Sequence, residues 1–312
     1  MIKSIEEYLA ELKKELSGSD PATIQDALAD AEEYLRTALS GTVSQNPGTS
    51  EAEALSSIIG KYGDPSEVAA AYKENESRTV PAFAQPTLPE IKPAAAGEVA
   101  LPQTRDQRGF FGRFFGVFAE PRAWGSLFYL ILSLATGIFY FTWAVTGLSL
   151  SAGLLILIIG LPIAALFLLS VRGIALIEGR MVEALLGVRM PRRLRFTEKN
   201  ASLWQRFKDL FTDKHTWFSI VYMIIHLPLG IFYFTLFVTL ISLSAGLIFW
   251  PLVSLIMNVP MFTAGSYEYF ATIWIIPFTA VAGVLMLAIT MHLAKALGKL
   301  QGAIAKGLLV RQ

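Results

Sequence analysis

The hexapeptide Gly-Ile-Phe-Tyr-Phe-Thr occurs twice in the chain, at residues 137–142 and again at residues 230–235. The copies are 93 residues apart (230 − 137), and the same offset holds well beyond the hexapeptide. When residues 113–154 are laid over residues 206–247, about half of the positions are identical. Two segments that were alike only in being apolar would not keep arginine, tryptophan, tyrosine and glycine in register. The sequence therefore predicts a duplicated unit.

The two repeats are expected over residues 109–200 and 201–312. Each begins with a short aromatic segment that contains basic residues, a composition typical of a helix in the headgroup region of a membrane. Trp124 and Trp217 follow at equivalent positions, where an interfacial anchor belongs. The repeated part is therefore predicted to be a membrane domain.

The net charge changes sign along the chain. Residues 1–76 carry 15 acidic and 6 basic side chains, a net charge of −9, whereas the remainder carries 10 acidic and 20 basic, a net charge of +10. This acidity argues against direct binding of nucleic acid by the N-terminal segment. The sequence has no cysteine, which excludes disulfides and cysteine-based metal or redox chemistry. The first long apolar stretch begins near Ser126, too deep for a cleaved signal peptide, so we expect the N-terminal segment to be cytoplasmic.

Residues 1–76 have the pattern of a small helical domain. Apolar residues recur at helical spacing in four short segments. Asp20-Pro21 predicts a helix start, and that helix is expected to end near Gly41. Ser50 and Glu53 have the spacing of a capping box before the third helix. The order YLAELKKEL, DALADAEEYL and GDPSEVAAAY resembles the HAAS family of bacterial helical signalling domains over residues 1–75. The resemblance implies a cytoplasmic protein-interaction domain.

Residues 77–108 contain five prolines and no hydrophobic periodicity. Such a composition predicts a semi-rigid tether rather than a folded element. The N-terminal domain is therefore expected to be able to reach the membrane half or to be released from it.

Four stretches are long and apolar enough to cross a bilayer, which takes roughly 20 residues. They lie at about 126–148, 153–171, 219–243 and 272–292. Residues 246–262 are apolar but interrupted by prolines, and we expect a re-entrant or outer-surface hairpin there, with a fifth span as the alternative. Basic residues cluster before the first span, between the second and third, and after the last. Because basic segments face the cytoplasm, four crossings with both termini cytoplasmic are predicted, and the two repeats are then parallel.

This half resembles the sensor domain found at the N-terminus of some bacterial histidine kinases, over about residues 120–310. The matching features are the GIFYF motif, the Gly160-Leu161-Pro162 turn, Glu178-Gly179-Arg180 and the Leu227-Pro228-Leu229-Gly230 motif. The resemblance implies perception of a signal at or within the membrane. Neither a phosphoacceptor helix nor an ATP-binding lid follows, so the output is expected to pass through protein contacts.

Two groups of residues are candidate sites. A perception site inside the membrane is predicted around Tyr140, Tyr233, His226 and Asn258, because titratable groups within spans are functional candidates. For His226 a simple hydrogen bond to a neighbouring helix is the alternative. A basic group is predicted to contact anionic lipid headgroups or the domain's own carboxylates, with topology determination alone as the alternative: Arg189, Arg192, Arg193 and Arg195.

The sequence thus predicts an all-α protein, with a small cytoplasmic helical domain and a four-span membrane bundle. The expected function is a non-enzymatic sensor in the bacterial cytoplasmic membrane, with lipids and a cytoplasmic regulatory protein as partners, and homo-oligomers as a further option. No cofactor and no metal are expected, since the three histidines lack ligand spacing. A transporter or channel component and a lipid-organising protein are the alternatives. The absence of charged residues deep within the expected spans argues against transport.

Overall fold

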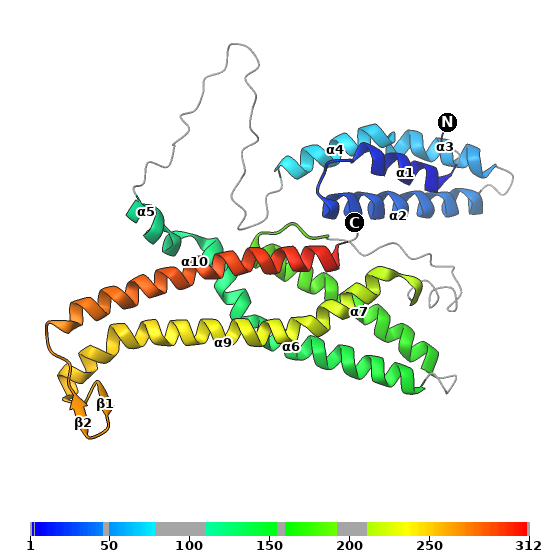
Figure 1. Cartoon of the computed structure of the whole chain (residues 1–312). Coiled ribbons are helices and arrows are strands. Elements are labelled where there is room, and N and C mark those ends of the chain that lie inside the picture. Colours follow the sequence, from blue (N-terminus) through cyan, green and yellow to red (C-terminus); the bar gives the residue numbers. More distant parts are fainter. Residues whose placement is uncertain are drawn as a thin grey trace, which may run out of the picture.

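The fold is known from a computed structural model, which describes residues 2, 4–45, 50–78, 110–154, 160–191 and 211–310. Among these residues the regular secondary structure is helical except for one two-stranded hairpin. The expected linker falls almost entirely outside the described residues, because helix α4 ends at Arg78. The chain forms two parts, an N-terminal domain of four helices and a bundle of long helices (Figure 1).

The N-terminal domain contains α1 (Ile5–Glu15), α2 (Pro21–Gln45), α3 (Glu51–Tyr62) and α4 (Pro65–Arg78). Its own hydrophobic core includes Tyr8, Leu12 and Leu35, all fully buried. The predicted start of α2 is confirmed, since the Ala22 amide donates to the Asp20 carboxylate at 2.9 Å.

Two details of this domain differ from the sequence prediction. Helix α2 continues past Gly41 to Gln45, because a single glycine costs a helix only about 1 kcal/mol and does not have to end it. Ser50 is the N-cap of α3 but makes no side-chain capping bond, so the predicted capping box does not form.

The second part begins with α5 (Phe110–Phe115) and a 3₁₀ turn, η1 (Gly116–Ala119). The long helices follow: α6 (Pro121–Leu154), α7 (Gly160–Leu186), α9 (Lys214–Met257) and α10 (Ile275–Leu309), with strands β1 (Phe262–Ala264) and β2 (Tyr267–Tyr269) before α10. Within the described part of the chain, these four long helices are the ones apolar enough to cross a membrane. Here "the bundle" means α6, α7, α9 and α10.

The second membrane helix lies further along the chain than predicted. It spans residues 160–186 rather than 153–171, so that charged residues expected in a loop are helical. The helix continues past Arg172 because this side chain is paired: it donates to Asp213 at 2.6 Å and to Thr216 at 3.1 Å. A paired charge costs far less to hold among packed helices than an isolated one.

Residues 246–257 do not form the expected re-entrant hairpin. They are the last turns of α9, which contains both Pro228 and Pro251. The chain reverses later, in the β1–β2 hairpin, where Phe262 pairs with Tyr269 and the rings stack at 4.6 Å. Trp250 on α9 donates to the Met261 carbonyl at 2.9 Å, which fixes the hairpin to the helix end.

The bundle is built around a crossing of α6 and α9. Helix α7 packs on α6, and α10 packs on both α9 and α6. From the crossing, the α6–α7 pair and the α9–α10 pair extend in different directions (Figure 1). The N-terminal domain lies beside the ends of α7 and α10 (Figure 1).

The outward faces of the bundle are strongly apolar, which suits a protein surrounded by lipid. Large exposed side chains lie along all four helices, and they include Phe128, Leu166, Phe232 and Phe278. A water-soluble protein rarely exposes apolar patches of this extent.

Candidate functional site

The polar centre of the bundle is a buried glutamate on α7. Glu178 is 1% exposed, and its carboxylate accepts hydrogen bonds from three tyrosine hydroxyls. Tyr129 and Tyr222 donate to Oε1, the latter at 2.7 Å, and Tyr140 donates to Oε2 at 2.8 Å. Hydrogen bonds to an ionised acceptor are roughly twice as strong as neutral ones. Three phenols therefore replace much of the hydration that a buried carboxylate loses.

A second acceptor continues this network on α10. Gln301 is fully buried; its Oε1 accepts from the Tyr233 hydroxyl at 3.2 Å, and its Nε2 donates to the Tyr222 hydroxyl at 3.3 Å. The Tyr222 hydroxyl also lies 3.3 Å from that of Tyr129. The network thus connects all four long helices through side chains that are 0–4% exposed.

His226 belongs to the same network. Its Nε2 lies 3.0 Å from Thr136 Oγ1 on α6, and its Nδ1 lies 3.4 Å from Gln301 Nε2. The ring is also in aromatic contact with Tyr140 and Tyr222, at centroid distances of 5.4 and 5.2 Å. The simple alternative, a hydrogen bond to a neighbouring helix, is therefore what this histidine makes.

The duplicated hexapeptide positions the network. In each copy the glycine and the tyrosine are buried, whereas the isoleucine and the first phenylalanine are more than half exposed. A Cβ atom on Gly137 would lie 2.9 Å from the Leu227 Cα, and one on Gly230 would lie 2.4 Å from the Ser133 carbonyl oxygen. Only glycine permits this approach, so α6 and α9 pack closely where they cross.

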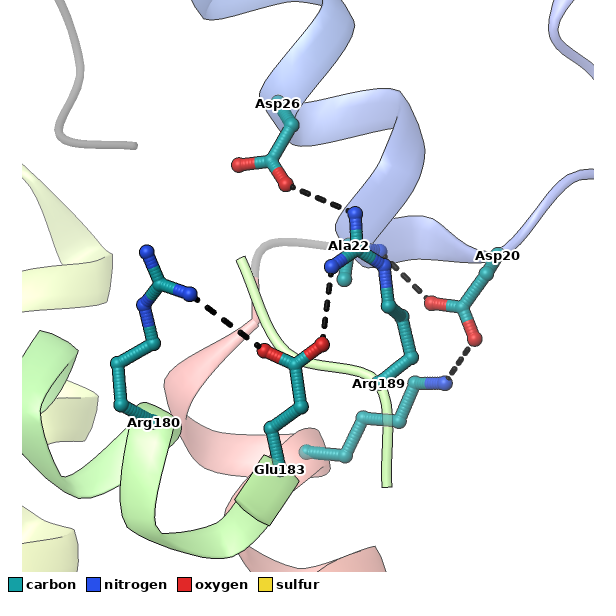
Figure 2. A network of polar contacts seen from close by, with 7 residues as sticks. Asp20, Ala22, Asp26, Arg180, Glu183 and Arg189 are labelled. Carbon is teal, nitrogen blue, oxygen red and sulfur yellow. Dashed lines mark hydrogen bonds and ion pairs between the residues drawn. The ribbon is translucent and has the colours of Figure 1, made fainter. Parts of the chain in front are cut away.

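The N-terminal domain contacts the bundle through a chain of charges, shown in Figure 2. Arg189, just after α7, donates to Glu183 at 3.0 Å and to Asp26 of α2 at 3.3 Å. Lys306 of α10 pairs with Asp20 at the start of α2. Ala22, between the two aspartates, is fully buried and joins the bundle's hydrophobic cluster. Charge and apolar contact thus combine in this interface.

The predicted site residues are only partly brought together. Tyr140, Tyr233 and His226 share the buried network, but Asn258 is exposed at the end of α9, in a left-handed conformation with φ 53°. The other predicted group is Arg189, Arg192, Arg193 and Arg195, of which Arg189 contacts carboxylates and the other three lie outside the described residues. Lipid contact by this group stays a prediction.

Sequence reasoning missed the acceptors of the network, Glu178 and Gln301. The predicted second span ends at residue 171, before Arg172, so Glu178 falls outside it. A signal was present, however: residues 175–188 and 296–310 resemble each other, and Glu178-Gly179 corresponds to Gln301-Gly302. Its partners Tyr129 and Tyr222 are equivalent in the two repeats, since they are 93 residues apart like the two hexapeptides.

The arrangement offers hydrogen-bond donors and acceptors, but it has no nucleophile beside a base. Within the described residues no group of three His, Asp or Glu side chains could hold a metal ion. It is a hydrogen-bond network in which one carboxylate fixes the rotamers of tyrosines on two other helices.

Comparison with known proteins identifies both parts of the chain. Residues 129–309 match the family described as "Putative sensor", and residues 7–71 match the HAAS family. Searches of curated proteins and of solved structures returned no match. The predicted fusion of a HAAS domain to a sensor domain is confirmed, and the two families are not enzymatic.

Proposed function

Because the chain belongs to this sensor family, we propose that the bundle perceives a membrane or envelope signal and that the N-terminal domain carries the output. Sensor and HAAS domains together fit a role in signalling. The finer proposal is that a change in the buried network alters how the N-terminal domain is held and what it binds.

The observation that carries this proposal is the position of Glu178. An ionisable residue inside a membrane helix is costly and is a functional candidate by default. Glu178 is held by tyrosines from α6 and α9, so its hydrogen bonds respond to any shift of these helices. Glu183, which holds Arg189 against Asp26, is five residues further along the same helix. One helix thus connects the buried network with the domain interface, about 7–8 Å away along its axis.

We place the protein in the bacterial cytoplasmic membrane with both termini in the cytoplasm. The ends of α7 and α10 both contact the N-terminal domain, through Arg189 and Lys306. Two helix ends that bind one small domain lie on the same side of the membrane, which requires an even number of crossings between them. Reporter fusions at Gly265 and Gln312 test this, and signals from the same side of the membrane would contradict it.

The apolar faces of the bundle and the N-terminal domain point to three kinds of partner. Lipids surround the apolar faces, and a cytoplasmic regulatory protein is the proposed partner of residues 1–75. Homo-oligomers are compatible with the exposed faces of α9 and α10, and crosslinking in membranes would detect them.

The test of coupling is Glu178→Gln in the full-length protein in lipid nanodiscs. The amide keeps the shape but loses the charge that three phenols stabilise, so we expect faster amide hydrogen exchange in the first turns of α2, by several-fold. Glu268→Gln, the same change at an exposed position in the β1–β2 hairpin, is the matched control and should have no effect. Equal exchange in both variants and the wild type would contradict the proposal.

Transport is the second candidate, and Glu178 favours it. Charged residues deep in a bundle often mark an ion path, and Glu178 lies in α7 beyond the end of the span that the sequence predicted. Proton flux into liposomes that carry the wild type or Glu178→Gln separates the two functions. A flux that depends on Glu178 would support transport.

A further inference from the structure

The N-terminal end of α2 presents two aspartates with an alanine between them. We propose that Asp20, Ala22 and Asp26 form a docking surface for a protein segment with two basic side chains, and that Arg189 and Lys306 occupy it in place of that partner. The contact would then be autoinhibitory. The proposed docking surface rests on the proposed function only in that the N-terminal domain carries the output.

The surface has the chemistry of a cation-binding site with an apolar centre. Asp20 accepts from the Lys306 ammonium with one carboxylate oxygen and from the Ala22 amide with the other. Asp26 accepts from Arg189 (Figure 2). Ala22 is fully buried in a cluster that contains Met190 and Val310. Met190 directly follows Arg189 in the chain, and Val310 lies four residues after Lys306. An occupant must therefore bring apolar side chains together with positive charge, which a protein segment does and a metal ion does not.

The contact is built so that it can be exchanged. Separating a buried ion pair is costly when one charge is left without a partner. Here Arg189 also donates to Glu183 at 3.0 Å, so it keeps that partner when the N-terminal domain leaves. Asp20 likewise keeps its bond to the Ala22 amide, because this bond lies within α2. Neither side loses all of its hydrogen bonds on release.

Three of the four charges of the interface are also within reach of solvent. Side-chain exposure is 29% for Lys306, 22% for Asp20 and 19% for Arg189, whereas Asp26 is nearly buried at 9%. Pairs of this kind are screened by salt, whereas fully buried pairs are screened much less. A basic partner segment can thus compete for the aspartates, and the net charge of −9 on residues 1–76 would attract it.

The docked state is tested by reversing charges in the full-length protein. The chain has no cysteine, so Lys61→Cys and Leu300→Cys, both at exposed positions, carry two unique spin labels for distance measurement in nanodiscs. We expect Lys306→Asp and Asp20→Lys each to lower the docked fraction at least five-fold, and the double reversal to restore it within two-fold. Lys299→Asp, the same change on an exposed residue of α10, is the matched control.

Unchanged distances in the single variants, or no restoration in the double variant, would overturn the proposal. Asp20→Asn removes the charge but keeps a good helix cap, so it covers the case in which Asp20→Lys fails to fold. A salt titration of the wild type needs no variant at all. The docked fraction should fall several-fold between 50 mM and about 500 mM salt, and a constant fraction would again overturn the proposal.

The kind of occupant is tested with a peptide of residues 301–312, which contains Lys306. The wild-type peptide should bind the full-length Lys306→Asp protein at least ten-fold more tightly than a variant peptide that carries Lys306→Asp. The wild-type peptide should also bind the Lys306→Asp protein more tightly than it binds the wild-type protein. Equal binding of the two peptides would show that the surface does not read basic segments. If the charge reversals confirm docking but Glu178→Gln leaves hydrogen exchange in α2 unchanged, the docking surface is supported and the coupling to Glu178 is contradicted. If Glu178→Gln changes the exchange but the charge reversals do not change docking, the coupling is supported and the docking surface is contradicted.

Discussion

The two halves of the bundle use the same tyrosine for different acceptors. In the first half Tyr140 donates to a carboxylate, Glu178, and in the second Tyr233 donates to an amide, Gln301. The helices that present the tyrosines are alike in sequence, whereas the facing positions on α7 and α10 differ in charge. Hydrogen bonds to an ionised acceptor are roughly twice as strong as those to a neutral one. The comparison predicts that Tyr140 is held more strongly than Tyr233.

The largest expected effect comes from removing the acceptors. Glu178→Ala leaves three buried hydroxyls without their acceptor, and each unsatisfied group costs about 1–3 kcal/mol, so we expect a loss of several kcal/mol of bundle stability. Gln301→Ala should cost less, since Gln301 accepts from one tyrosine and donates at longer distances. Unfolding in detergent with increasing denaturant measures both variants. Equal losses would contradict the asymmetry between the halves.

The glycine crossing gives the next largest effect. Gly230→Ala places a methyl group 2.4 Å from the Ser133 carbonyl oxygen, and Gly137→Ala places one 2.9 Å from the Leu227 Cα. Overpacking of this kind costs about 1–3 kcal/mol, with Gly230 the more sensitive position. Gly153→Ala and Gly246→Ala are matched controls, because they are also repeat-equivalent and have no atom within 4 Å of the added methyl. A crossing that tolerates both changes would mean that α6 and α9 can separate.

Removing the two hydroxyls compares the halves directly. Tyr140→Phe removes a bond to a carboxylate and should cost about 1.5–3 kcal/mol, whereas Tyr233→Phe removes a neutral bond and should cost about 0.5–1.5 kcal/mol. Thermal unfolding of both variants in the same detergent gives the difference. If Tyr233→Phe costs as much as Tyr140→Phe, Glu178 does not act as a charged acceptor.

The smallest effect is expected where the halves are the same. Trp124 Nε1 donates to the Phe118 carbonyl at 2.8 Å, and Trp217 Nε1 donates to the Phe211 carbonyl at 2.9 Å. Both rings are partly exposed, so Trp124→Phe and Trp217→Phe should each cost only about 0.5–1 kcal/mol, and equally. The same unfolding measurement applies. A clear difference between the stability losses of Trp124→Phe and Trp217→Phe would mean that the two halves differ at these tryptophans as well as at Glu178 and Gln301.

The sequence predicted the helical class, the N-terminal domain and the grouping of Tyr140 with Tyr233 in one site, because these follow from periodicity and from the repeat. It did not predict the extent of α7. Hydropathy ends a span at the first charge, and only the fold brings Asp213 and Thr216 to Arg172. Glu178 was missed for that reason. Carboxylates were one of the partner classes predicted for Arg189, but the individual residue could not be predicted, since Asp26 is 163 residues away in the chain.

The glycine crossing also has a mechanical consequence. Gly230 is 16 residues from the start of α9 and 27 residues from its end, which gives arms of about 24 Å and 40 Å at 1.5 Å per residue. A rotation of about 10° at such a pivot moves the short arm's end by about 4 Å and the long arm's end by about 7 Å. The Met257 end of α9 therefore travels further than the Lys214 end, so one small rotation at the crossing displaces the two ends of the helix by unequal distances.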